Sequence, residues 1–206
     1  MIIKILSVTR DAEKIIEKAA RTCYQSSDKI AENSHKDFIK RLIKAGHLSV
    51  LEHGYITIRL KNVSRSLTHQ LVRHRLCSFS QRSQRYVSEH GFSYTIPPKI
   101  EKDKKNKEIF TRCMNNIRNN YKEMVESGIP KEDARYVLPN SCHTEIVFSC
   151  NFRELRHMFE LRGSIRAQWE IRKTFIGILR KVKKLAPSCF YDFKIDEEKM
   201  IIKKEK

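Results

Sequence analysis

The sequence predicts an α+β fold, in which a single domain over residues 1–206 combines helices with a mainly antiparallel sheet. Residues 55–61 alternate apolar and polar side chains with the period of a strand that has one buried face. Residues 104–127 and 151–184 instead carry apolar side chains at helical spacing. The two kinds of segment follow one another without regular βαβ alternation, which disfavours a doubly wound parallel sheet.

The N-terminal elements are predicted from short apolar runs and from residues that cap helices. Residues 2–8 are typical of a strand, and Asp11 is a candidate N-cap for the helix that follows. Ser34 is a candidate N-cap for a helix over residues 35–45 that stops at Gly46. The expected apolar positions are Ile15, Ile16, Ala19 and Cys23 in the first helix, and Phe38, Ile39, Leu42 and Ile43 in the second.

The remaining elements follow from the same periodicities. After the 55–61 strand we expect a helix over residues 64–76. The 104–127 helix should end at Gly128 and Pro130, with an apolar stripe of Ile109, Cys113, Ile117, Tyr121 and Met124. Residues 144–150 return to strand, and the 151–184 helical region breaks near Gly163 before a core stripe of Ile171, Phe175, Ile178 and Val182.

Composition points to a folded protein in a reducing compartment. The chain has 206 residues, 40% of them hydrophobic and 32% charged, and this length and balance suit one globular domain. The N-terminus lacks the features of a signal peptide, and no stretch approaches the ~20 apolar residues that span a bilayer. The six cysteines show no CxxC pair. We therefore expect free thiols and a cytoplasmic location, with no membrane partner.

The formal net charge of +18 indicates anionic ligands without specifying them. Nucleic acid, acidic membrane surfaces and small phosphorylated molecules all fit, and so does a lysine-rich solvated surface. None of the six glycines forms GxGxxG or a Walker loop, so a bound phosphate would have to be held by side chains. Arginine suits that role because its planar fork stays charged and pairs with phosphate.

Polar side chains are concentrated in residues 67–86, LTHQLVRHRLCSFSQRSQRY. On a helix, Gln70 and His74 would continue the stripe of Val63 and Leu67 and face inward. Burying an amide or an imidazole costs roughly 1–3 kcal/mol unless it is hydrogen-bonded, so both groups need partners from the protein or from a ligand. The neighbouring arginines favour an anionic ligand.

Within this segment, RHR at residues 73–75 followed after seven residues by Ser83 is similar to the signature of the flavin-dependent thymidylate synthases. Gln84, Arg85 and Tyr86 continue the family pattern. The resemblance extends to ARTCY and GHLSVLEH upstream and to ARYVLP and AQWEIR downstream, and so covers residues from about 20 to 190. Five separate blocks in the same order are far more specific than one motif.

The resemblance implies the fold and the reaction of this family. Its members make dTMP from dUMP, with 5,10-methylenetetrahydrofolate as carbon donor, NADPH as reductant and FAD as cofactor. Hydride from the reduced flavin reaches C6 of the uracil ring, which makes C5 nucleophilic toward the methylene group. No enzyme cysteine or metal is required. The resemblance also implies a homotetramer with shared active sites.

The resemblance assigns site residues by their place in the motifs. Arg162 is the candidate catalytic residue, a fixed cation beside the pyrimidine ring. The candidate dUMP ligands are Gln70, Arg73, Ser83, Gln84, Arg85, Arg135 and Arg162, with Arg135 reaching a neighbouring subunit. The candidate FAD contacts are His47, Ser49, Arg73, His74, Arg75, Gln81, Asn151, Arg153 and Leu161.

Two positions depart from the family pattern. Arg166 stands where many relatives have histidine, and His157 stands where asparagine is frequent. Both put flavin or folate contacts in doubt and leave the main signature intact. Trp169 is interpreted as a core or interface anchor.

Two other classes of function remain open. A nucleic-acid-binding protein is supported by the charge and by arginines interleaved with Phe79 and Tyr86, but no nucleic-acid-binding module is visible. A zinc protein is suggested by Cys142 and His143, but paired ligand spacing is lacking. We therefore expect small-molecule substrates, with neither nucleic acid nor metal bound.

Overall fold

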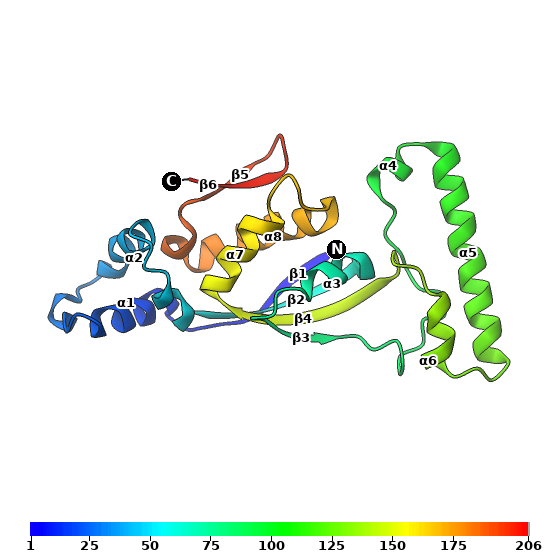
Figure 1. Cartoon of the computed structure of the whole chain (residues 1–206), viewed down its shortest axis with the longest axis horizontal. Helices are drawn as coiled ribbons and strands as arrows, with labels where there is room; N and C mark the ends of the chain where they lie inside the picture. Colours follow the sequence, from blue (N-terminus) through cyan, green and yellow to red (C-terminus); the bar gives the residue numbers. More distant parts are fainter. Residues whose placement is uncertain (206) are drawn as a thin grey trace. The chain divides into compact units, whose positions relative to one another are not determined.

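The computed structural model describes residues 1–205 and divides them into two compact units (Figure 1). Unit 1 comprises residues 1–2, 60–71 and 80–147. Unit 2 comprises residues 3–59, 72–79 and the described residues from 148 onward. Helices occur together with antiparallel sheet, which confirms the predicted α+β class. The expectation of one domain over residues 1–206 stays a prediction.

The main sheet has four strands in the order β1-β2-β4-β3. These are β1 (Ile2–Val8), β2 (Tyr55–Ser64), β4 (His143–Asn151) and β3 (Ser78–Gln81). Every second side chain of β4 is buried, as its alternating sequence requires. A separate antiparallel pair joins β5 (Phe193–Asp196) to β6 (Ile201–Lys204). The three predicted strands are confirmed, and β3, β5 and β6 were not predicted.

Unit 2 contains four longer helices, which are α1 (Ala12–Thr22), α2 (Ser34–Lys44), α7 (Phe152–Arg162) and α8 (Trp169–Leu185). The break near Gly163 and the α8 stripe are confirmed, since Ile171, Phe175, Ile178 and Val182 are at most 1% exposed. Phe159 of α7 packs edge-on against Phe175. Three 3₁₀ turns complete this unit, at Ser27–Lys29, Ser49–His53 and Pro187–Phe190.

Unit 1 contains α3 (Arg65–Leu71), α4 (Pro98–Glu101), α5 (Lys104–Glu126) and α6 (Lys131–Ala134), followed by a 3₁₀ turn at Arg135–Val137. Its small core consists of Phe92, Met114 and Cys142. The predicted α5 helix is confirmed, but its apolar stripe is only half buried. Tyr121 is fully buried, whereas Ile109 is 45% exposed and Cys113 is exposed, because this core covers only part of the long helix.

Three local predictions are wrong in their details. Asp11 occupies the N-cap position of α1 in a left-handed conformation, and its side chain makes no capping bond. Asn33, not Ser34, is the N-cap of α2, and the Ser34 hydroxyl donates to Glu17 instead. The helix expected over residues 64–76 ends at Leu71, because His74 turns inward to a long-range partner.

Within residues 1–205, every helix is too short or too polar to serve as a membrane span.

Candidate active site

The RHR motif lies in unit 2, in the turn that follows residue 71. Its members have opposite environments. Arg73 and Arg75 are exposed, whereas His74 is 5% exposed. The motif therefore presents two cations to solvent and fixes the imidazole between them in the protein interior.

The His74 imidazole joins a buried carboxylate to the candidate catalytic arginine. His74 Nδ1 lies 3.0 Å from Glu154 Oε1, and Arg162 Nε donates to His74 Nε2 at 2.9 Å. Because Nε2 accepts, the proton of the neutral ring must sit on Nδ1 and donate to Glu154. Burial lowers the pKa of His74, the nearby Arg162 cation adds to this shift, and Glu154 opposes it. The guanidinium of Arg162 is thus held by a neutral, oriented histidine.

Sequence reasoning missed Glu154. Its backbone N–H donates to Asn151 Oδ1 at 2.8 Å, so Asn151 caps the first turn of α7. A carboxylate three residues after an N-cap usually indicates a capping box. Here the Glu154 side chain bonds His74 instead, and only the tertiary structure reveals that choice.

A cleft of about 760 Å³ lies within unit 2, beside the N-terminal half of α7. Its lining residues are Leu48, Glu52, Tyr55, Leu76, Asn151, Arg153, Glu154, Arg156, His157, Glu160 and Lys204. Arg153 is held at 2.6 Å by Glu52. The volume is in the range of ligand sites, and the basic groups at its wall suit a phosphorylated cofactor.

The other expected cofactor residues of unit 2 are placed less closely. His47 is exposed, and Ser49 lines a second hollow of about 580 Å³ with Cys23 and His53. Leu161 is 48% exposed. Arg166, one of the two departures from the family pattern, is exposed as well. The contacts of these four residues within unit 2 do not define how they would hold a ligand.

Five candidate substrate residues lie in unit 1, and two of them, Arg85 and Arg135, bond the same residue. Arg85 Nε donates to Glu132 Oε2 at 3.1 Å, and Arg135 Nε donates to the Glu132 carbonyl at 3.0 Å. The Ser83 hydroxyl accepts the backbone N–H of Arg85 at 3.2 Å. Arg85 and Arg135 therefore come together, as a pair of cations that both bond Glu132.

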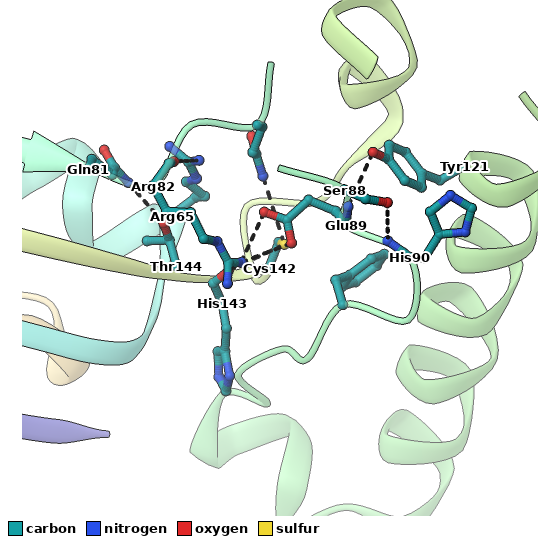
Figure 2. A network of polar contacts seen from close by, with 12 residues as sticks. Arg65, Gln81, Arg82, Ser88, Glu89, His90, Tyr121, Cys142, His143 and Thr144 are labelled. Carbon is teal, nitrogen blue, oxygen red and sulfur yellow. Dashed lines mark hydrogen bonds and ion pairs between the residues drawn. The ribbon is translucent and has the colours of Figure 1, made fainter. Parts of the chain in front are cut away.

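The same unit contains a polar network that sequence reasoning did not find (Figure 2). Arg82 donates to both carboxylate oxygens of Glu89 at 2.9 Å and to the His143 carbonyl at 2.8 Å. Burial raises the pKa of Glu89, which is 3% exposed, and Arg82 opposes that shift. Burial also raises the pKa of the Cys142 thiol to about 11. No local pattern distinguishes this arginine from its exposed neighbours.

The predicted site residues are divided between the two units. Unit 1 holds Gln70, Gln81, Ser83, Gln84, Arg85 and Arg135. Unit 2 holds His47, Ser49, Arg73, His74, Arg75, Asn151, Arg153, Leu161 and Arg162. Gln81 donates to Thr68 at 2.9 Å and Gln70 to the Ser66 carbonyl at 3.2 Å. Among residues 1–205 no cluster of three or more His, Cys, Asp or Glu side chains could hold a metal ion.

Comparisons with known proteins agree with the motifs. A family model described as "Thymidylate synthase complementing protein" matches residues 4–188. A protein of Geobacter sulfurreducens is 41% identical over 200 residues, which cover 93% of this chain and 86% of the relative. A protein of Clostridium tetani is 40% identical over 91% of this chain and 84% of the relative. One of Saccharolobus solfataricus is 39% identical over 91% and 75%.

All three relatives are named flavin-dependent thymidylate synthase. The family model covers most of the chain, including the RHR motif, Ser83, Arg135 and Arg162. This chain therefore belongs to the flavin-dependent thymidylate synthase family.

Proposed function

We propose that this enzyme converts dUMP, 5,10-methylenetetrahydrofolate, NADPH and a proton into dTMP, tetrahydrofolate and NADP⁺. The two electrons come from NADPH, and the carbon comes from the folate. Bound FAD would supply hydride to C6 of the uracil ring. The residues of this chain would bind, orient and polarise the pyrimidine.

The observation that carries the proposal is the Glu154–His74–Arg162 chain. Negative charge develops on the uracil ring as hydride reaches C6, and a preorganised cation stabilises such charge without reorganising. Arg162 is half-buried, and its Nε–H is held by a neutral histidine, which leaves the guanidinium fully charged and oriented. Arg162 is therefore the proposed catalytic residue.

The unit 2 cleft is the proposed place for part of the FAD. Asn151 and Arg153 line it, and Lys204 adds a further cation. Arginine and lysine suit a pyrophosphate, and Asn151 offers an amide to a polar group. His47, Ser49, Arg73, His74, Arg75, Gln81 and Leu161 complete the proposed FAD contacts. His157 also lines this cleft, where its ring lies 6.1 Å from that of His74.

We assign binding of the dUMP phosphate and ring to polar residues of the 67–86 segment, together with Arg135 and Arg162. The proposed ligands are Gln70, Arg73, Ser83, Gln84, Arg85, Arg135 and Arg162. Arg135 would serve the site of a neighbouring subunit in a homotetramer, as the family resemblance implies. The six free cysteines suit a reducing cytoplasm.

The decisive assay is release of tritium from 5-tritiated dUMP by purified protein supplied with FAD, NADPH and methylenetetrahydrofolate. Each component is omitted in turn. Tritium release should require all of them, and Arg162→Ala should reduce it by roughly 100-fold or more. Arg180→Ala is the matched control, because Arg180 is an exposed residue of α8 that pairs with Glu197. This variant should keep wild-type activity.

Two outcomes would count against the proposal. Tritium retained on the uracil under every condition, together with salt-dependent oligonucleotide binding by folded protein, would favour the nucleic-acid alternative. Equal tritium release by Arg162→Ala and Arg180→Ala would remove Arg162 from the reaction.

A further inference from the structure

The Arg82–Glu89 ion pair closes the loop that carries three of the proposed dUMP ligands. We propose that this pair is a positioning device, which holds residues 82–89, here called the substrate loop, in the conformation that binds dUMP. The proposal rests on the proposed function, because it takes Ser83, Gln84 and Arg85 as substrate ligands.

Arg82 anchors the first end of the substrate loop through both backbone and side chain. Its N–H donates to the Glu145 carbonyl at 2.9 Å, and its own carbonyl accepts from Arg65 at 2.8 Å. Its guanidinium reaches the His143 carbonyl and both oxygens of Glu89. Residue 82 is therefore fixed by four different groups of unit 1.

Glu89 anchors the second end from a buried position. Its N–H donates to the Tyr121 hydroxyl at 3.2 Å, and its carbonyl accepts from Phe92 at 3.1 Å. Figure 2 shows its carboxylate directed toward Arg82 and Cys142. A buried carboxylate is costly unless it is paired, so its presence here requires Arg82.

Between these two ends, the loop makes two exposed contacts with α6, in which Arg85 Nε donates to Glu132 Oε2 at 3.1 Å and Lys131 Nζ donates to the Tyr86 carbonyl at 3.2 Å. Tyr86 is 72% exposed and Val87 is 43% exposed, so apolar packing does not fix the loop. Inside it, Val87 N–H donates to the Ser83 carbonyl and Arg85 N–H to the Ser83 hydroxyl. These local bonds shape a turn, and exposed contacts such as the pair with Glu132 contribute little stability, so we assign most of the placement to the two ends.

Glu89 also acts on one ligand directly. The Gln84 side chain opposes the rise in the pKa of the Glu89 carboxylate, and its Nε2 donates to Cys142 Sγ at 3.9 Å. A carboxylate accepts only, so the Gln84 amide must turn its NH₂ group toward it. The carbonyl oxygen of Gln84 is then the group left to accept a hydrogen bond from a substrate.

Isothermal titration of FAD-loaded protein with dUMP tests the proposal. Arg82→Met keeps the aliphatic stem, and Glu89→Gln keeps shape and one acceptor. Each should raise the Kd for dUMP about tenfold, as expected if the binding conformation is then populated about one tenth of the time. FAD content and kcat at saturating dUMP should not change. The double variant should bind no more weakly than the weaker single variant, because both changes break one interaction.

Matched variants separate the possible failures. Glu126→Gln, which breaks an exposed pair with Lys122 on α5, should leave the Kd unchanged. An unchanged Kd in both folded single variants, additive single effects, or parallel loss of FAD would each overturn the positioning role. Glu89→Gln alone decides the question if Arg82→Met fails to fold. If Ser83→Ala and Arg85→Ala leave the Kd unchanged as well, the assignment of the substrate ligands fails. If these two variants raise the Kd while Arg82→Met and Glu89→Gln do not, only the role of the ion pair is refuted.

Discussion

Replacing Glu154 by leucine should displace Arg162 without altering it. Glu154 accepts from His74 Nδ1 at 3.0 Å, and Arg162 Nε donates to His74 Nε2 at 2.9 Å. Nε2 accepts only while the ring proton stays on Nδ1. Leucine offers no acceptor, so the proton becomes free to move to Nε2. There it would face the Arg162 donor and separate the two side chains.

The magnitude follows from the burial of the pair. His74 is 5% exposed and Glu154 is 6% exposed. Loss of a hydrogen bond to a charged group, with a buried donor left unpaired, costs about 2–3 kcal/mol. Each kcal/mol lowers the Tm of a protein of this size by about 2–4 °C, so the Tm should fall by roughly 4–12 °C. A guanidinium misplaced by about 1 Å should lower kcat by roughly 100-fold.

Thermal unfolding of FAD-loaded protein and tritium release from 5-tritiated dUMP measure the two effects. The control is Glu154→Gln, which places an amide oxygen where the carboxylate oxygen was. It should lose about 1 kcal/mol and keep most of the activity, because the Nδ1 proton still has an acceptor. Equal kcat in the leucine and glutamine variants would refute the tautomer argument.

Three further outcomes are expected. Burial lowers the pKa of His74, so the folded protein binds fewer protons at this residue than the unfolded chain does. The free energy of unfolding, measured by urea denaturation, should therefore fall as the pH drops below about 6.5, and it should fall less in His74→Gln. Gly163→Ala should lower the Tm, because a Cβ would lie 2.5 Å from Ile202 Cβ, and an overpacked contact of this kind costs about 1–3 kcal/mol. Iodoacetamide at about pH 8 should label exposed Cys113 and spare Cys142, whose pKa is raised to about 11, and peptide mass spectrometry would detect any contrary labelling.

Periodicity predicted the elements whose burial is decided locally. β4 alternates along its whole length, so both of its ends were found closely, and α8 keeps an unbroken apolar stripe, so its C-terminal end was found closely as well. The α5 stripe shows the limit of such reasoning. Its spacing indicated a helix, but the burial of Ile109 depended on whether another element would cover it.

Motif spacing predicted the family and the candidate site residues, and the family assignment is confirmed. The roles of these residues stay predictions. Sequence reasoning missed Glu154, Glu89 and Arg82, whose side-chain partners no local pattern indicates. A glutamate that reaches a histidine 80 residues away has the same local pattern as one that caps its own helix.

The sequence alone determined the α+β class, the long helices, the central strands and the family, because these depend on periodicity and on ordered motifs. Only the tertiary structure decided where the 64–76 helix ends, which proton His74 carries and which arginine pairs with Glu89. The first two outcomes depend on Glu154, 80 residues from His74, and the third depends on how the chain folds back between Arg82 and Glu89, which are seven residues apart. Burial then makes the partnership obligatory, because an unpaired polar group in the interior costs more than the local conformation gains.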